Sequence, residues 1–184
     1  MEIARVASTV LQNDWRIVIG CFDGPEASVD WSIDLSGTAV PKVTGGSSAR
    51  RAWAAHWANQ LIPLFTRKLQ PEQRRPGTNW LGALQSSAGL PGLRSVYLFS
   101  DLVQQAEGIS LLKDIDDAQL RAIVGVWAPR LGALKGHHVY EIGSGQGTQH
   151  PEAAERGRAL LRYLAASVPF HLSIQTVVAE APPV

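Results

Sequence analysis

The stretch SVYLFSDL, Ser95–Leu102, brings an apolar run to an end at a carboxylate, Asp101. A short apolar run of this kind is suited to a buried strand. Ionised carboxylates are rarely buried without a partner, so Asp101 needs a cation, hydrogen-bond donors or water. A metal ion would meet that need. The alternative is structural, because a Ser-Asp pair after a strand also caps turns and helices.

The composition limits the kinds of partner. The chain has 184 residues, 45% hydrophobic and 18% charged, which is typical of a globular domain. Its 17 basic and 16 acidic residues give a net charge of +1, so we expect neither a nucleic-acid partner nor a membrane partner. No apolar stretch approaches the roughly 20 residues of a membrane-spanning helix.

The cysteine content favours a reducing compartment. Cys21 is the single cysteine, so no internal disulfide can form, and no Cys/His group has the spacing of a zinc site. The first residues, MEIARVASTVLQ, lack the basic segment and apolar run of a secretion signal. We therefore expect a cytoplasmic protein.

Strands and helices are predicted to alternate along the chain. Runs of β-branched and aromatic residues predict strands at 15–22, 29–35, 95–100, 137–143 and 171–178. Apolar residues at helical spacing predict helices at 2–13, from Ser47 or Ser48 to Phe65, at 77–89, from Asp116 or Asp117 to Pro129, and from Pro151 to Val168. Thr78 is placed to cap the third of these helices.

This alternation indicates an α/β fold with a mostly parallel, twisted sheet, because parallel neighbours need crossover connections. Helices are expected on both faces of the sheet, giving three layers, with Trp53, Trp57, Trp80 and Trp127 as core residues. We see no domain boundary, so we predict a single domain over residues 1–178 and a loose tail at 179–184.

Two motifs, in this order and at this spacing, resemble the von Willebrand factor A (vWA) domain. They are GTNWLGAL, Gly77–Leu84, and VYLFSDL, Val96–Leu102. In that family a loop threonine opens a helix in the pattern G-T-x-x-x-x-A-L, and the next strand ends in an aspartate after Thr or Ser. The resemblance covers most of the chain and implies a Rossmann-like, three-layer fold.

The resemblance also implies a metal-ion-dependent adhesion site on the carboxyl edge of the sheet. There Thr78 would give Mg²⁺ a hydroxyl and Asp101 a carboxylate, directly or through water, with Ser100 supporting these ligands. This is physically reasonable, because Mg²⁺ takes oxygen ligands and open parallel sheets bind ligands at the carboxyl ends of their strands.

The chain departs from the family at its beginning. Family members start with a central strand ending in D-x-S-x-S, which holds the main metal ligands, and that strand is missing before the helix predicted at 2–13. The nearest letters, Asp34–Thr38, follow the wrong strand. Either the reading frame begins upstream, or the chain is a shortened variant, or another segment fills the sheet, since a gap leaves backbone groups unpaired. With two ligands left, Mg²⁺ binding should be weak or absent.

A glycine-rich motif gives a rival interpretation. VYEIGSGQG, Val139–Gly147, is similar to the first motif of methyltransferases that use S-adenosylmethionine, where glycines let the backbone approach the cofactor. In that family the motif opens the sheet, whereas here only a helix, a strand and a short tail follow it. The other interpretation is a flexible glycine loop on the same edge as Asp101. His137, His138 and His150 are expected to be structural or solvent-exposed.

The resemblance thus implies a protein-interaction domain and not an enzyme. Mg²⁺, where it is bound, would bridge to an acidic group of a protein partner. Two alternatives stay open: a domain similar to methyltransferases that use S-adenosylmethionine, and a metal-free module with a structural or assembly role.

Overall fold

A computed structural model describes residues 18–21, 31–34, 78–143 and 150–175, together with seven helical residues between 48 and 60. The described residues fall in two compact units. The first unit holds residues 18–21, 31–34 and the seven helical residues, and the second unit holds the remainder. Each unit is described by itself.

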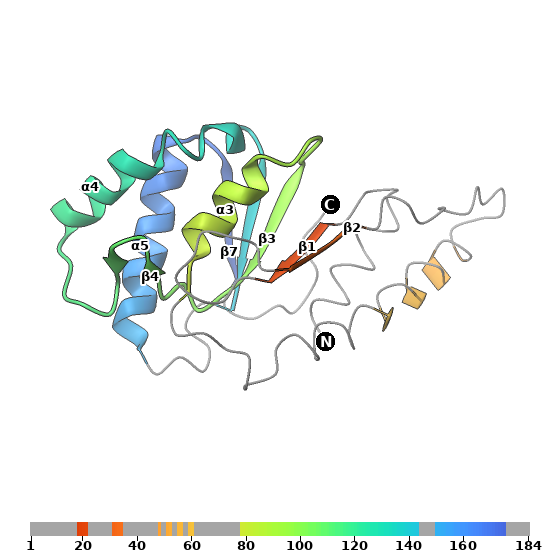
Figure 1. The fold of residues 1–184 in the computed structure, drawn as a ribbon, viewed down its shortest axis with the longest axis horizontal. Coiled ribbons are helices and arrows are strands. Elements are labelled where there is room, and N and C mark those ends of the chain that lie inside the picture. The colour runs from red at the N-terminus through yellow and green to blue at the C-terminus, as the bar shows by residue number, and fades with distance from the viewer. Residues whose placement is uncertain are drawn as a thin grey trace. The chain divides into compact units, whose positions relative to one another are not determined.

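The first unit contains a pair of antiparallel strands. Strand β1 (Val18–Cys21) pairs with β2 (Trp31–Asp34), from Val18 opposite Asp34 to Cys21 opposite Trp31 (Figure 1). Both strands lie inside the predicted ranges. The strand at 29–35 therefore exists, and its direction is opposite to that of β1.

Seven described residues lie within the range of a helix that the sequence predicted. Ser48, Arg51, Ala52, Ala55, His56, Asn59 and Gln60 are helical and exposed, three or four positions apart. This spacing places them on one face. The predicted apolar positions of this helix, Trp53 and Trp57 among them, and the helix predicted at 2–13 lie outside the described residues.

The second unit is built on a parallel sheet, as predicted. Strands β3 (Ser95–Phe99), β6 (His138–Ile142) and β7 (His171–Gln175) lie in the order β3-β6-β7. Tyr97 lies opposite Tyr140, which lies opposite Ser173. The crossovers that parallel pairs require contain α4 (Asp117–Trp127) between β3 and β6, and α5 (Pro151–Ser167) between β6 and β7.

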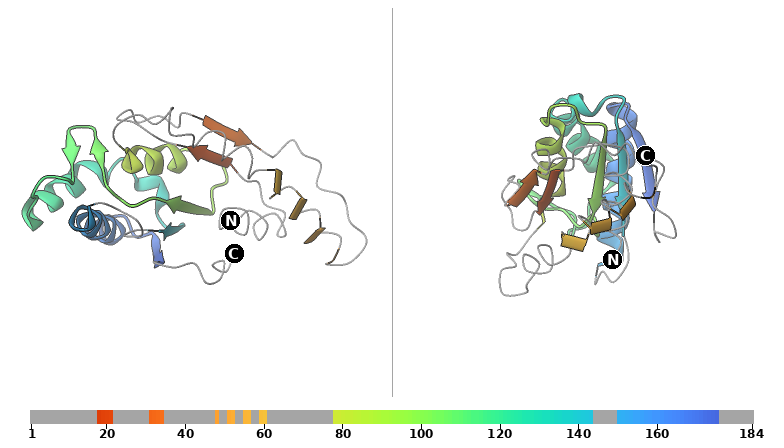
Figure 2. Two further views of the ribbon diagram at one scale, coloured as in Figure 1. Left: turned by 90° about the horizontal axis from the view of Figure 1, so that it is seen from below. Right: turned by 90° about the vertical axis from the view of Figure 1, so that its right-hand side faces the viewer.

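The helices of the second unit lie on one side of this sheet (Figures 1 and 2). Val96, Leu98 and Val139 point to that side and belong to one buried core with the helices α3 (Trp80–Ala88), α4 and α5. The predicted core residues Trp80 and Trp127 are 0% and 2% exposed. Mixed α/β structure is therefore present, but the described residues show helices on one face only, and the three-layer arrangement stays a prediction.

The other face of the sheet carries a row of rings. Tyr97 stacks on Tyr140 with ring centroids 4.8 Å apart, and the exposed rings of His138 and His171 stack at 4.7 Å. Burial raises the pKa of Tyr97 to about 12, and the nearby phenol of Tyr140 adds to this effect. The histidine at 138 is thus exposed and packed against a second ring, in line with the structural or solvent role predicted for it.

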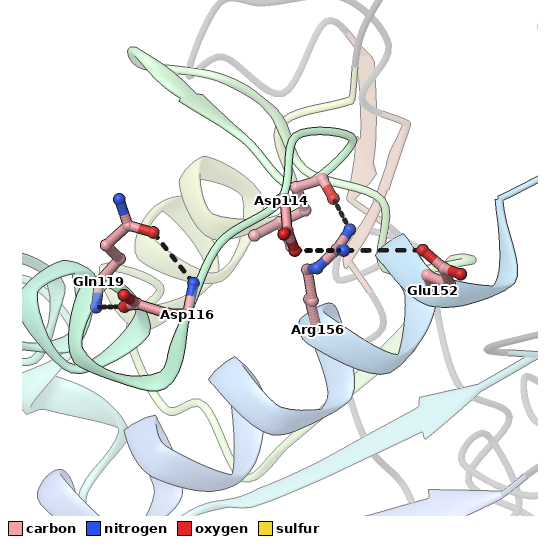
Figure 3. A network of polar contacts seen from close by, with 6 residues as sticks. Asp114, Asp116, Gln119, Glu152 and Arg156 are labelled. Atoms are coloured by element: carbon pink, nitrogen blue, oxygen red, sulfur yellow. Dashed lines mark hydrogen bonds and ion pairs between the residues drawn. The ribbon is translucent and has the colours of Figure 1, made fainter.

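Local sequence signals fix the starts of the two long helices. Asp116 caps α4: its carboxylate accepts from the Gln119 amide at 2.8 Å, and the Gln119 side chain accepts from the Asp116 amide at 2.9 Å (Figure 3). Pro151 occupies the first turn of α5, where a missing N–H costs nothing. The sequence predicted Pro151 in this role and gave Asp116 as one of two possible starts of α4, the other being Asp117.

Arg156 ties the loop after β3 to α5. Its guanidinium donates to the Leu111 carbonyl at 3.1 Å and to Asp114 at 3.0 Å, and lies 3.7 Å from Glu152 (Figure 3). The side chain of Arg156 is 18% exposed, so the contact with Leu111 is sheltered, whereas both carboxylates face solvent. This contact fixes the loop against α5.

Two short elements were not predicted. Strands β4 (Gln105–Ala106) and β5 (Ile109–Ser110) form a tight hairpin, and η2 (Gly132–Leu134) is a 3-10 turn. The hairpin turns at Glu107 and Gly108, whose φ angles of 55° and 75° are both positive. Two consecutive positive φ values are typical of two-residue hairpin turns, in which glycine is favoured.

Candidate functional site

The candidate site lies at the carboxyl end of β3. The amide of Ser100 donates to the carbonyl of Ile142 at 3.3 Å, so the pairing of β3 with β6 continues one residue beyond the strand. Asp101 follows directly. The aspartate therefore stands where the strand ends, at the edge at which parallel sheets bind ligands.

Ser100 and Asp101 both cap the turn that follows them. The Ser100 hydroxyl accepts from the amide of Leu102 at 3.0 Å, and Oδ1 of Asp101 accepts from the amide of Val103 at 3.0 Å. Leu102 has a φ of 61°, a conformation that non-glycine residues seldom adopt. The turn-capping role considered for this Ser-Asp pair is thus present, and any metal contact would use the other oxygen, Oδ2, of the half-buried Asp101.

The loop of Thr78 is bonded to the segment that follows Asp101. The carbonyl of Thr78 accepts from the amide of Gln105 at 2.9 Å. The indole N–H of Trp80 donates to the carbonyl of Leu102 at 3.1 Å, away from water. The structure therefore brings together the two segments that carry the predicted ligands, Thr78 and Asp101, at one edge of the sheet.

The prediction that Thr78 caps the helix is wrong, because Asn79 is the cap. Helix α3 begins at Trp80, and Oδ1 of Asn79 accepts from the amide of Gly82 at 2.9 Å. Asparagine is at least as good a cap as threonine, so the neighbouring residue takes the role. As a result, the hydroxyl of Thr78 is not used for capping, and it belongs to a half-buried residue.

Gln104 completes a buried polar cluster that sequence reasoning missed. Its Nε2 donates to Oδ1 of Asn79 at 3.0 Å, and its Oε1 accepts from the amide of Leu81 at 3.3 Å. Gln104 is 0% and Asn79 1% exposed. The capping preference of asparagine was a usable signal for Asn79, but nothing local marks Gln104, whose partner lies 25 residues away.

One donor of this cluster has no acceptor. Since Oδ1 of Asn79 receives two N–H groups, from Gly82 and Gln104, the side-chain amide cannot be turned over, and Nδ2 points away from both. Within the described part of the chain, Nδ2 is the buried side-chain nitrogen or oxygen without a hydrogen bond. Such a donor costs about 1–3 kcal/mol, and its presence calls for an explanation.

Helix α5 packs against the same turn, at Leu102. A Cβ atom placed on Gly157 would lie 2.7 Å from the Cβ of Leu102, and closer still to its carbonyl oxygen. Only glycine allows this approach. The turn at 100–104 is thus held by α3 through Trp80 and by α5 through Gly157.

The oxygen ligands at this site are of the type that a hard cation binds, but there are few of them. The Thr78 hydroxyl and the Asp101 carboxylate are oxygen ligands of the type that Mg²⁺ takes, and Mg²⁺ keeps the waters that protein oxygens do not replace. The hydroxyl of Ser100 is engaged by the Leu102 amide. No group of three His, Cys, Asp or Glu side chains comes together in the ranges that the structure describes. Thr78 and Asp101 are therefore the residues here that could hold such an ion, and Mg²⁺ binding stays a prediction.

The glycine motif can be placed only in part. Glu141 and Ile142 lie on β6 and are 0% and 5% exposed, and Gly143 follows with a φ of 97°. Residues 144–149, which contain the other glycines, lie outside the described residues. The cofactor site proposed for this motif therefore stays a prediction.

Comparisons with models of protein families, with characterised proteins and with solved structures found no match. Among the helices that the structure describes, none is both long and apolar enough to cross a membrane.

Proposed function

We propose that the second unit is a protein-interaction domain of the vWA type. In this proposal Thr78 and Asp101 hold Mg²⁺ weakly at the carboxyl edge of the sheet. The ion then accepts an acidic group of the partner, whose oxygen takes the place of a water.

One observation supports this proposal above the others: the hydrogen bonds that join the Thr78 loop to the segment after Asp101. A shared ion requires that ligands distant in sequence be positioned by a rigid framework. Here that framework is the bond from Gln105 to Thr78, together with the bond from Trp80 to Leu102. The capping use of Oδ1 also orients the Asp101 carboxylate, which favours ligation by the remaining oxygen.

The test is the broadening of amide signals by Mn²⁺ in an NMR spectrum of the full chain. Mn²⁺ takes the same oxygen ligands as Mg²⁺ and broadens the signals of nearby amides. We expect the amides near Thr78 and Asp101 to broaden first, and excess Mg²⁺ to restore them.

Asp101→Asn separates metal binding from turn capping. The amide oxygen can still accept from Val103, so the fold is kept, but the charge is lost, and roughly tenfold more Mn²⁺ should be needed. Asp114→Asn is the matched control, because its carboxylate is fully exposed and is paired with Arg156. Broadening centred on Asp114, or broadening unchanged by Asp101→Asn, would contradict the proposal.

A metal-free assembly module is the second candidate. It is favoured by the hydrogen bonds of Ser100 and Asp101, which already explain why both residues stand at this turn. In that case neither Mg²⁺ nor Mn²⁺ produces binding heat in calorimetry, and Asp101→Asn leaves partner binding unchanged.

A further inference from the structure

Strand β3 has a free edge among the described strands. It lies at the end of the order β3-β6-β7 and pairs with β6 alone. The carbonyl of Arg94 and the amide of Ser100 both bond to the segment of β6. Backbone groups of residues two apart point to the same side of a strand, so Ser95, Tyr97 and Phe99 direct their N–H and C=O groups away from β6.

These outward groups have no hydrogen bond within the part of the chain that the structure describes. An edge of this kind normally carries a charge or a proline that prevents further pairing. From Ser95 to Phe99 there is neither, and the side chains are buried or half-buried. The edge therefore has the properties of a strand that pairs, not of one that is protected from pairing.

The edge is complementary to itself. If two copies of β3 lie antiparallel with Tyr97 opposite Tyr97, then Ser95 lies opposite Phe99 of the second copy. All three outward residues then form hydrogen-bonded pairs, in which the two residues exchange both N–H···O bonds. No other strand is needed to satisfy them.

The charges at the ends of β3 favour the same arrangement. The antiparallel register places Arg94 opposite Ser100 of the second copy, next to Asp101 of that copy. Opposite charges therefore meet at both ends. A parallel pairing would bring like charges together and would not have the twofold symmetry common in dimers.

We infer that the chain forms a symmetric dimer through the outer edge of β3, so that the two parallel sheets join into one continuous sheet. The partner at this edge is a second copy of the chain. The dimer goes beyond the proposed metal site and does not depend on it, since the backbone groups of β3 form its hydrogen bonds and the charge of Asp101 adds only an attraction at the ends.

Hydrogen exchange of the full chain, followed at each amide by NMR, tests the dimer without any substitution. The amides of Tyr97 and Phe99 should become protected as protein concentration rises, in step with the doubling of mass seen by sedimentation. The amides of Val96 and Leu98 face β6 and serve as an internal control, because they should be protected at every concentration.

Ser95→Pro tests the backbone directly. Proline removes one outward N–H from each copy, and it is tolerated at the first residue of a strand. We expect the dimer dissociation constant to rise roughly tenfold, whereas the control Ser95→Ala keeps the N–H and should keep the dimer.

Two results would overturn the inference. One is a protein that stays monomeric at millimolar concentration with fast exchange at Tyr97 and Phe99. The other is a monomer in which these amides are protected at every concentration, because another segment of the same chain would then cover the edge.

Discussion

At the scale of single residues, the side-chain amide of the buried Asn79 makes the hydrogen bonds that hold the candidate site together. Its oxygen caps α3 and anchors Gln104, while its nitrogen is buried without an acceptor. Thr78, one position earlier, bonds to the described segment 100–105 through its backbone carbonyl. Neighbouring residues thus differ: the side chain of Asn79 holds the fold together, whereas Thr78 is the residue to which the proposal assigns the ligand.

This division predicts opposite sensitivities for the two positions. Asn79→Ala should lower the free energy of unfolding by about 2 kcal/mol, because it removes the cap of α3 and leaves the Gln104 side chain without an acceptor. Thr78→Ala is the matched control and should change it by less than about 0.5 kcal/mol. Urea unfolding of both variants measures the difference. Equal loss in the two variants would show that Asn79 is not the residue that holds this edge.

The raised pKa of Tyr97 predicts a loss of stability in alkali. The folded protein keeps this proton up to about pH 12, whereas the unfolded chain releases it near 10. Below pH 10 both states are protonated, so the stability falls only as the pH rises above 10. Tyr97→Phe cannot release a proton, and its free energy of unfolding should decline less than that of the wild type between pH 9 and about pH 11. An equal decline in both proteins would rule out this linkage.

At the scale of elements, α5 packs closely against the turn after β3 because Gly157 of α5 has no side chain. Gly157 lies inside α5, where glycine by itself is unfavourable, yet it allows Leu102 to approach the helix backbone. The cost in helix propensity is offset by the packing of the turn that carries Asp101.

Two glycine-to-alanine substitutions should therefore have opposite signs. Gly157→Ala should destabilise the protein by roughly 2 kcal/mol, because the new methyl group overlaps Leu102. Gly125→Ala in α4 has open space around its Cβ position and should stabilise by roughly 0.5–1 kcal/mol through helix propensity. Thermal unfolding of the two variants gives the comparison, and a stabilising Gly157→Ala would contradict the close approach seen at Leu102.

The same elements show what the sequence could predict. The first-turn Pro151 and the strand Ser95–Phe99 depend on residues within one turn or one strand, so local patterns were sufficient. For the cap of α4, local patterns left the choice between Asp116 and Asp117, and the structure shows Asp116. The approach of Gly157 to Leu102 depends on a residue distant in sequence. The sequence around a helical glycine does not show which distant residue packs against it. The prediction of Thr78 as the cap failed for a smaller reason, since the neighbouring Asn79 is an equally good cap and its contact with Gln104 favours it.

At the scale of the whole molecule, a parallel three-stranded sheet with helices on one side is the part of the predicted architecture that the structure contains. Alternating strands and helices predicted the parallel pairing correctly, because parallel pairing requires crossovers, whereas helices on both faces of the sheet stay a prediction. The sequence could not predict that β3 would stand at the end of the order of the described strands, since strand order depends on contacts between distant segments. The two proposals use different parts of β3: its carboxyl end for the ion, and its outer edge for a second copy.

The hydrogen bond from Trp80 to Leu102 has an optical consequence. An indole that is shielded from water and bonded to a single carbonyl fluoresces at shorter wavelength than one in contact with solvent, and Trp80 is 0% exposed. Any event that displaces the turn at 100–104 would break the hydrogen bond from Trp80 to the Leu102 carbonyl and shift the fluorescence emission of Trp80. Trp80, one of the six tryptophans of the chain, thus reports a displacement of this turn without any added label.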